Sequence, residues 1–124
     1  MANPKYNQKK GATFESAIVN FIRKVGHTAE RLRLGGQGND QGDIVAVIAG
    51  KTYIIEAKNV QRLDLSTFWD EAVVEAKNYA KNRGLEQVPP AYIVVKRRNA
   101  SIEKAWVICP LKEWIEQCQH HTDI

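Results

Sequence analysis

The sequence contains few cysteines and no long apolar run, and each absence excludes a class of protein. Its two cysteines, Cys109 and Cys118, cannot build the disulfide framework of a small secreted domain, and no Cys and His residues are spaced as zinc ligands. No segment approaches the roughly 18–20 apolar residues of a membrane span, and the first ten residues carry no signal-peptide core. We therefore expect an intracellular, cytoplasmic protein with no membrane contact, which in a viral setting lies in the host cytoplasm.

Repeats, low-complexity segments and long blocks of one charge are also lacking. The 124 residues are therefore expected to form one domain, 1–124, in which 1–10 are a flexible basic arm. Residues 1–34 carry seven Lys or Arg against two acids, and residues 91–104 carry four against one. Basic ends around a slightly acidic centre suit a protein that binds a polyanion. A solvated basic surface is the alternative interpretation.

Apolar periodicity and turn residues predict the order helix, three strands, helix, strand, strand and short helix. The second long helix is capped by Asp64 or Ser66 and closes at Gly84. It leads to a continuous apolar strand, which indicates a buried parallel neighbour in a mixed sheet. The expected strands cover 28–34, 43–48, 52–58, 91–96 and 105–109, and the expected helices cover 12–25, 66–83 and 110–119.

The predicted hairpin over 43–58 carries charged residues on apolar strands. With a two-residue turn at 49–50, the register sets Asp43 opposite Glu56, with Cβ atoms about 5 Å apart. Lys58 lies on the same face because side chains alternate along a strand. Two facing carboxylates repel each other, and a bound hard cation such as Mg²⁺ is the simplest compensation. The register therefore predicts a metal site beside a lysine.

The same residues carry a family resemblance. Gly42-Asp43, followed after twelve residues by Glu56-Ala57-Lys58, resembles the PD-(D/E)xK nuclease signature, with Gly in place of Pro. With a preceding helix that carries Glu15, a Gly- and Gln-rich link and a following helix and strand, residues 11–98 are similar to the archaeal-type Holliday junction resolvases and their phage-borne relatives. The resemblance implies an α/β fold with a restriction-endonuclease-like αβββαβ core, a mixed β-sheet flanked by helices.

The resemblance also implies a metal-dependent DNA endonuclease with Glu15, Asp43, Glu56 and Lys58 as catalytic residues. Mg²⁺, for which Mn²⁺ substitutes, is expected on Asp43, Glu56, the Ala57 carbonyl and Glu15, the last directly or through water. Lys58 is expected to stabilise the transition state, because nearby carboxylates would raise its pKa and disfavour a role as a base.

The residues by themselves leave alternatives open. Glu15 sits at the edge of the apolar stripe of its helix, where an acid is commonly exposed. The charges of residues 56–58 can also be a surface pattern on an edge strand, although the apolar neighbours indicate burial. Asp40 is a rival of Asp43 for the metal. Glu75, four residues before Tyr79 on the second long helix, stands where related nucleases often have Gln, and either supports the site or is solvated.

Branched double-stranded DNA is the expected partner. The Gly-rich segment 35–42 is expected to let a DNA backbone approach closely. The residues expected to bind nucleic acid are basic or amide-bearing: Lys9, Lys10, Arg31, Arg33, Gln37, Asn39, Lys96, Arg97 and Arg98.

The leading hypothesis is resolution of four-way (Holliday) junctions in recombination and repair. The alternatives are a nickase or repair nuclease acting on other branched or damaged DNA, and a nucleic-acid-binding module without chemistry. A homodimer is expected, because a four-way junction has two equivalent strands to cut. Its interface would use Trp106, Trp114 and Ile115, or Phe68 and Trp69, all of which can equally be ordinary core.

Overall fold

The structure, a computed structural model, describes residues 4–32 and 43–121, with side chains described for 10–32 and 43–119. Five strands and three α-helices follow one another in the predicted order, with one short 3-10 helix added before the last strand. The elements are α1 (Pro4–Lys24), β1 (Thr28–Arg31), β2 (Ile44–Ile48), β3 (Lys51–Lys58), α2 (Leu65–Asn82), β4 (Ala91–Val95), η1 (Ile102–Lys104), β5 (Trp106–Ile108) and α3 (Leu111–His121).

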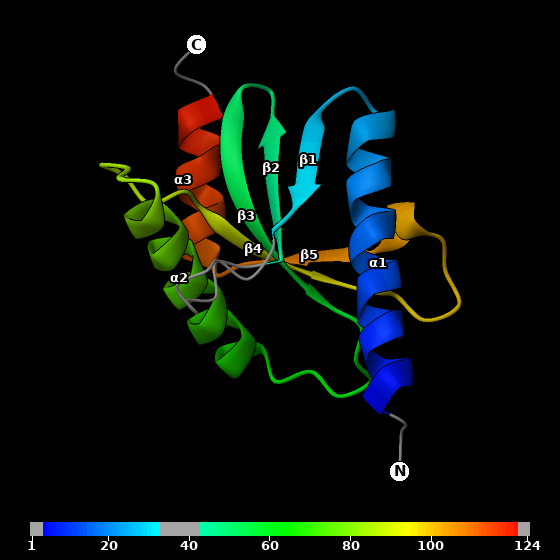
Figure 1. Ribbon diagram of the computed structural model, residues 1–124. Helices are drawn as coiled ribbons and strands as arrows, with labels where there is room; N and C mark the ends of the chain where they lie inside the picture. The colour runs from blue at the N-terminus through cyan, green and yellow to red at the C-terminus, as the bar shows by residue number, and fades with distance from the viewer. Residues whose placement is uncertain (1–3, 33–42, 122–124) are drawn as a thin grey trace.

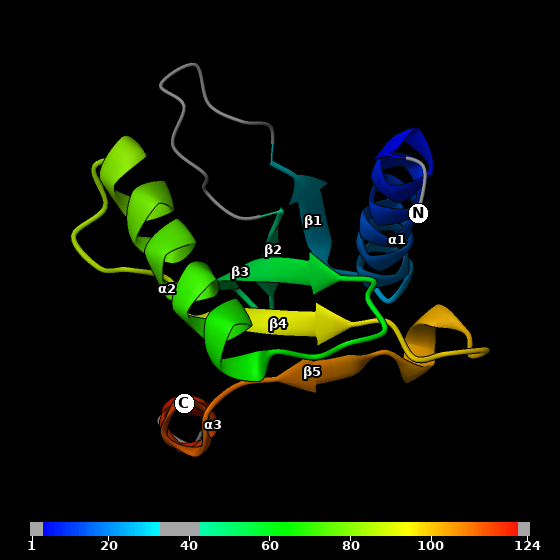
Figure 2. The same cartoon turned by 90° about the horizontal axis from the view of Figure 1, so that it is seen from below.

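The strands form one mixed sheet in the order β1-β2-β3-β4-β5 (Figure 1). Only β3 and β4 are parallel, because α2 carries the chain back across the sheet between them. Helix α1 covers one face and α2 the other, as Figure 2 shows from below. Each helix packs on its own apolar core. The core under α1 surrounds Ile18 and Ile44, and the core under α2 surrounds Ile54 and Ala76. The predicted αβββαβ core, with its C-terminal strand and helix, is confirmed.

The β2–β3 hairpin has the predicted register. Ile48 pairs with Lys51, and the pairing continues to Ile44 with Ile55. The turn residues Ala49 and Gly50 have φ values of 51° and 81°. Positive φ at both positions is typical of the two-residue turns whose twist matches that of the strands. The turn therefore fixes which residues face each other at the far end of the hairpin.

Helix α2 begins at the predicted cap. The Asp64 carboxylate accepts the backbone N–H of Thr67 at 3.3 Å and its hydroxyl at 2.8 Å, which satisfies a donor that the first helical turn leaves open. At the other end Gly84 has a φ of 64°, a conformation that glycine adopts without steric cost. The predicted bounds of this helix are correct to within one residue.

The N-terminal boundary was predicted wrongly. We expected an arm over residues 1–10 and a helix over 12–25, but α1 begins at Pro4 and ends at Lys24. Gly11 lies inside this helix, although glycine disfavours a helix interior by about 1 kcal/mol. Pro4 stands in the first turn, where its fixed φ suits a helix and its missing N–H costs nothing. The first strand ends at Arg31 and not at 34, and the last strand is three residues long.

Candidate active site

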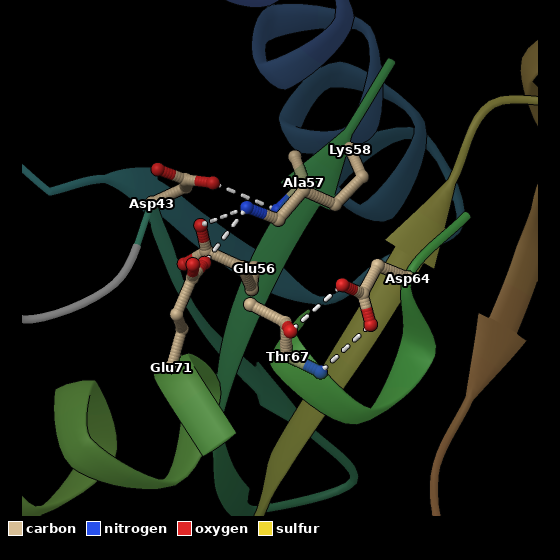
Figure 3. Close-up of polar contacts among 7 residues, drawn as sticks. All are labelled: Asp43, Glu56, Ala57, Lys58, Asp64, Thr67 and Glu71. Atoms are coloured by element: carbon tan, nitrogen blue, oxygen red, sulfur yellow. Dashed lines mark hydrogen bonds and ion pairs between the residues drawn. The ribbon is translucent and has the colours of Figure 1, made fainter. Parts of the chain in front are cut away.

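Asp43 stands one residue before β2, where the hairpin ladder continues. Its N–H donates to the carbonyl of Ile55 at 3.2 Å, and its carbonyl accepts the N–H of Leu32 at 2.8 Å. Its side-chain Oδ2 accepts the N–H of Ala57 at 2.8 Å (Figure 3). These three bonds hold the carboxylate at the end of the sheet, beside Ala57 and next to the last register pair, Ile44 with Ile55. The expected pair of Asp43 with Glu56 lies one step beyond that register and stays a prediction, because the N–H of Asp43 bonds to Ile55.

Lys58 is held by contacts with its own strand and with α2. Its Nζ lies 3.5 Å from Oε1 of Glu56 and 3.1 Å from Oε2 of Glu71 on α2, as Figure 3 shows. It also lies 4.6 Å from the centre of the Phe68 ring. Glu56 is only 6% exposed, and a buried carboxylate requires a nearby opposite charge. The ammonium group is therefore fixed beside Glu56 by a helix as well as by its own strand.

The pKa of Lys58 shows which chemical role it can take. Burial disfavours the charged form and lowers this pKa, but the hydrogen bonds and charges of Glu71 and Glu56 together outweigh burial. The pKa of Lys58 is therefore raised above the ordinary lysine value, and the side chain is a cation at neutral pH. A protonated lysine can stabilise negative charge but cannot accept a proton, in agreement with the expected electrostatic role.

Glu15 approaches the same end of the sheet from α1. Its carboxylate lies 3.7 Å from Nη2 of Arg31. Burial raises the pKa of Glu15, the charge of Asp43 raises it further, and Arg31 partly offsets both. The influence of Asp43 means that the two carboxylates are within electrostatic reach of each other. Three acidic side chains from α1, the start of β2 and β3 thus converge on one region.

The donor set fits a hard divalent cation that keeps part of its water shell. Asp43 and Glu56 supply carboxylate oxygens, and Ala57 supplies a backbone carbonyl. Within residues 10–32 and 43–119, no three His, Cys, Asp or Glu side chains are placed to hold a metal ion on their own. Mg²⁺ commonly binds through one or two carboxylates and several waters, so two carboxylates are sufficient for such a site.

Comparison with protein families and with solved structures shows what this chain is similar to. The model of the archaeal Holliday junction resolvase family (Hjc) matches residues 6–116. This chain belongs to the archaeal Holliday junction resolvase family. Among solved structures, the chain is similar to Hjc of Archaeoglobus fulgidus, a Holliday junction resolvase from an archaeal hyperthermophile. The two are 25% identical over 71% of this chain and 68% of the other, with a TM-score of 0.49. A search of curated proteins gave no match.

The residues of this family member that were expected to bind nucleic acid do not all gather at one place. Lys10, Lys96 and Arg97 line one hollow, and Arg98 lies in the exposed turn after β4. Arg31 is the ion-pair partner of Glu15 and is exposed. The remaining expectations fall outside the described side chains: Lys9, Arg33, Gln37, Asn39 and the rival metal ligand Asp40.

Glu75 lies inside the protein. It is 6% exposed and neighbours the buried Tyr79 on α2, so a solvated position is excluded. The sequence left both alternatives open because Glu75 and Tyr79 lie on the flank of the small-residue stripe of the helix. Glu75 lies one helical turn after Glu71. Its burial agrees with the other interpretation, in which it supports the site from behind.

Glu71 is a site residue that was not predicted from the sequence. Its α2 position lies three residues after Phe68, so the two side chains share one helix face and reach Lys58 together. The signal available in the sequence was the cap at Asp64, which sets the phase of the first two helical turns. It does not give the distance between α2 and β3, and the contact depends on that distance.

Replacing Glu71 by Gln is expected to lower the pKa of Lys58, because a hydrogen bond and a charge that both raise it are removed. The NMR signals of the Lys58 ε-methylene, followed through an alkaline titration, measure this change. Asp70→Asn is the matched control, since it removes a carboxylate from an adjacent, exposed position of the same helix. An unchanged titration in Glu71→Gln, or an equal shift in the control, would contradict the contact.

Proposed function

We propose that this protein is a Mg²⁺-dependent endonuclease that cuts four-way DNA junctions as a homodimer, with the whole chain forming one nuclease domain. Membership of the archaeal Holliday junction resolvase family makes it a junction-resolving nuclease that acts on branched DNA. The observations that support the site assignment are the bond from the N–H of Ala57 to the Asp43 carboxylate and the ion pair of Lys58 with Glu56. Mn²⁺ is proposed as a substitute for Mg²⁺, because both prefer oxygen ligands.

Each residue of the site has a separate proposed role. Asp43, Glu56 and the Ala57 carbonyl would hold the cation, which when bound supplies an activated water and neutralises phosphate charge. Lys58 stabilises the additional negative charge that develops on the phosphate in the transition state. Glu71 keeps the lysine in position, and Glu15 orients a water from α1.

No helix within 4–32 or 43–121 has the length and apolar character that a membrane span requires.

A second copy of the chain is proposed to cover β5 and α3. Trp106 and Trp114 are 51% and 57% exposed, and Val107, Leu111 and Ile115 are exposed as well. Ordinary core is therefore excluded for the two tryptophans, while Phe68 and Trp69 are partly buried against α2's own core. Strand β5 is also a sheet edge with unpaired backbone groups, which proteins commonly cover. A two-fold pair presents two sites to the two equivalent strands of a junction.

Asp43→Asn and Glu56→Gln are expected to reduce cleavage of a four-way junction in Mg²⁺ by about 10²–10³-fold or more. Junction affinity should stay the same or rise slightly, because the carboxylates repel phosphate. Lys58→Ala should also lose cleavage. The measurement is single-turnover cutting of matched four-way, three-way, flap and linear substrates, with gel-shift affinities alongside.

In that assay, preferential cutting of the four-way substrate at paired positions supports the proposed substrate. Equal cutting of flap and linear DNA would favour a repair nuclease, and cuts on a single strand per binding event would favour a nickase. Normal cleavage by either carboxylate variant would remove that residue from the site.

Trp114→Arg is expected to convert the protein from a dimer to a monomer, because burying the arginine charge in an apolar interface without an opposite charge is strongly unfavourable. Light scattering after size-exclusion chromatography measures the mass. Lys112→Gln, at an exposed position of the same helix, is the control and should remain dimeric. A wild-type monomer at concentrations at which both junction strands are cut would overturn the homodimer.

A further inference from the structure

A hollow of about 400 Å³ lies on the α1 side of the sheet, where β3 and β4 end. Its volume is within the range of about 300–1,000 Å³ that is typical of small-molecule sites. Phe14 and Ala17 of α1 and Ile102 and Ala105 around η1 form its apolar wall. Because β3 and β4 are parallel, both carboxyl ends meet here, which is where open α/β sheets commonly bind ligands.

Asn59, the first residue after β3, also lines this hollow. Its Oδ1 is buried and has no hydrogen-bond partner among the described residues, but because that atom is closed to water it does not face the open space of the hollow. The hollow therefore offers a ligand its apolar wall and the charged side chains of its lining.

The charges around the hollow favour an anion. Half-buried Lys10 and exposed Lys96 and Arg97 line it, and among the described residues no Asp or Glu belongs to the lining, although Glu103 accepts a hydrogen bond from Ser101 at its edge. An apolar interior with three cations at its lining matches a nucleotide, whose base is flat and apolar on its faces and whose phosphate is negative.

We propose that this hollow holds one unstacked nucleotide of the DNA substrate, with its base against the apolar wall and its phosphate on Lys10, Lys96 and Arg97. This proposal rests on the proposed function and adds a subsite to it. Lys58 contacts α2, and the next residue, Asn59, lines a hollow against α1, so Lys58 and the hollow lie on opposite faces of one strand end. The N–H of Lys96 also donates to the carbonyl of Lys58 at 3.0 Å, which ties the two regions together.

Such a subsite would favour branched DNA over continuous duplex. Extruding a base from a continuous stack costs a few kcal/mol, and the cost is lowest where pairing or stacking is already interrupted. A branch point interrupts the stack, whereas a linear duplex does not. The subsite would therefore contribute to junction preference without contributing to sequence preference.

The test uses four-way junctions in which 2-aminopurine replaces single bases around the branch point, bound by the full-length protein in EDTA so that no strand is cut. We expect fluorescence to rise at one position per half of the junction, because the probe leaves the stack. Ser101→Trp, which fills the hollow from an exposed position, should abolish the rise.

Thr28→Trp is the matched control, since it adds the same side chain at an exposed site beyond the other end of α1 and should keep the fluorescence rise. No rise at any position with wild type, or an equal rise with Ser101→Trp, would overturn the subsite. Wild-type cutting of the same junctions in Mg²⁺ would then still support the proposed function. Failure of wild type to bind or cut them would instead contradict that function.

Discussion

The hydrogen bonds that tie Asp43 to two neighbouring strands are the constraint on which the rest of the site depends. The residue lies just outside β2, yet its N–H, carbonyl and carboxylate are all bonded to β3 or to the residue after β1. The carboxylate is thereby directed toward the end of β3, where Glu56 and Lys58 lie. Without these bonds the segment before β2 would not hold the Asp43 carboxylate near Glu56.

The acidic pair would be unstable without the cation supplied by Lys58. Glu56 is buried, and Asp43 is close enough to raise the pKa of Glu15, so negative charge accumulates at this end of the sheet. Lys58 compensates part of that charge and is itself restrained by Glu71 and Phe68 of α2. The arrangement keeps the lysine protonated, and a divalent cation would compensate the remaining negative charge. The same physical requirement, neutralisation of clustered carboxylates, thus connects folding with the proposed chemistry.

The sequence predicted the hairpin and its three charged residues because these depend on local rules. A two-residue turn and alternation along the strands set the register as far as Ile44 and Ile55. The bonds of Asp43 to β3 and to Leu32 then hold its carboxylate beside the end of β3. Glu71 and the burial of Glu75 were not predictable in this way, because both depend on how closely α2 packs on the sheet. The start of α1 was missed because its first two turns are polar and carry no apolar periodicity. The hollow at Asn59 combines four separate segments and has no local signature.

The central claim is that Asp43 and Glu56 hold one divalent cation beside Lys58. Titration of the protein with Mn²⁺, followed by electron paramagnetic resonance of the free ion, tests this claim most directly. The account predicts saturable binding by wild type and by Glu71→Gln, and its loss in both Asp43→Asn and Glu56→Gln while the fold, monitored by circular dichroism, is unchanged. Equal Mn²⁺ binding by wild type and by the two carboxylate variants would contradict the account.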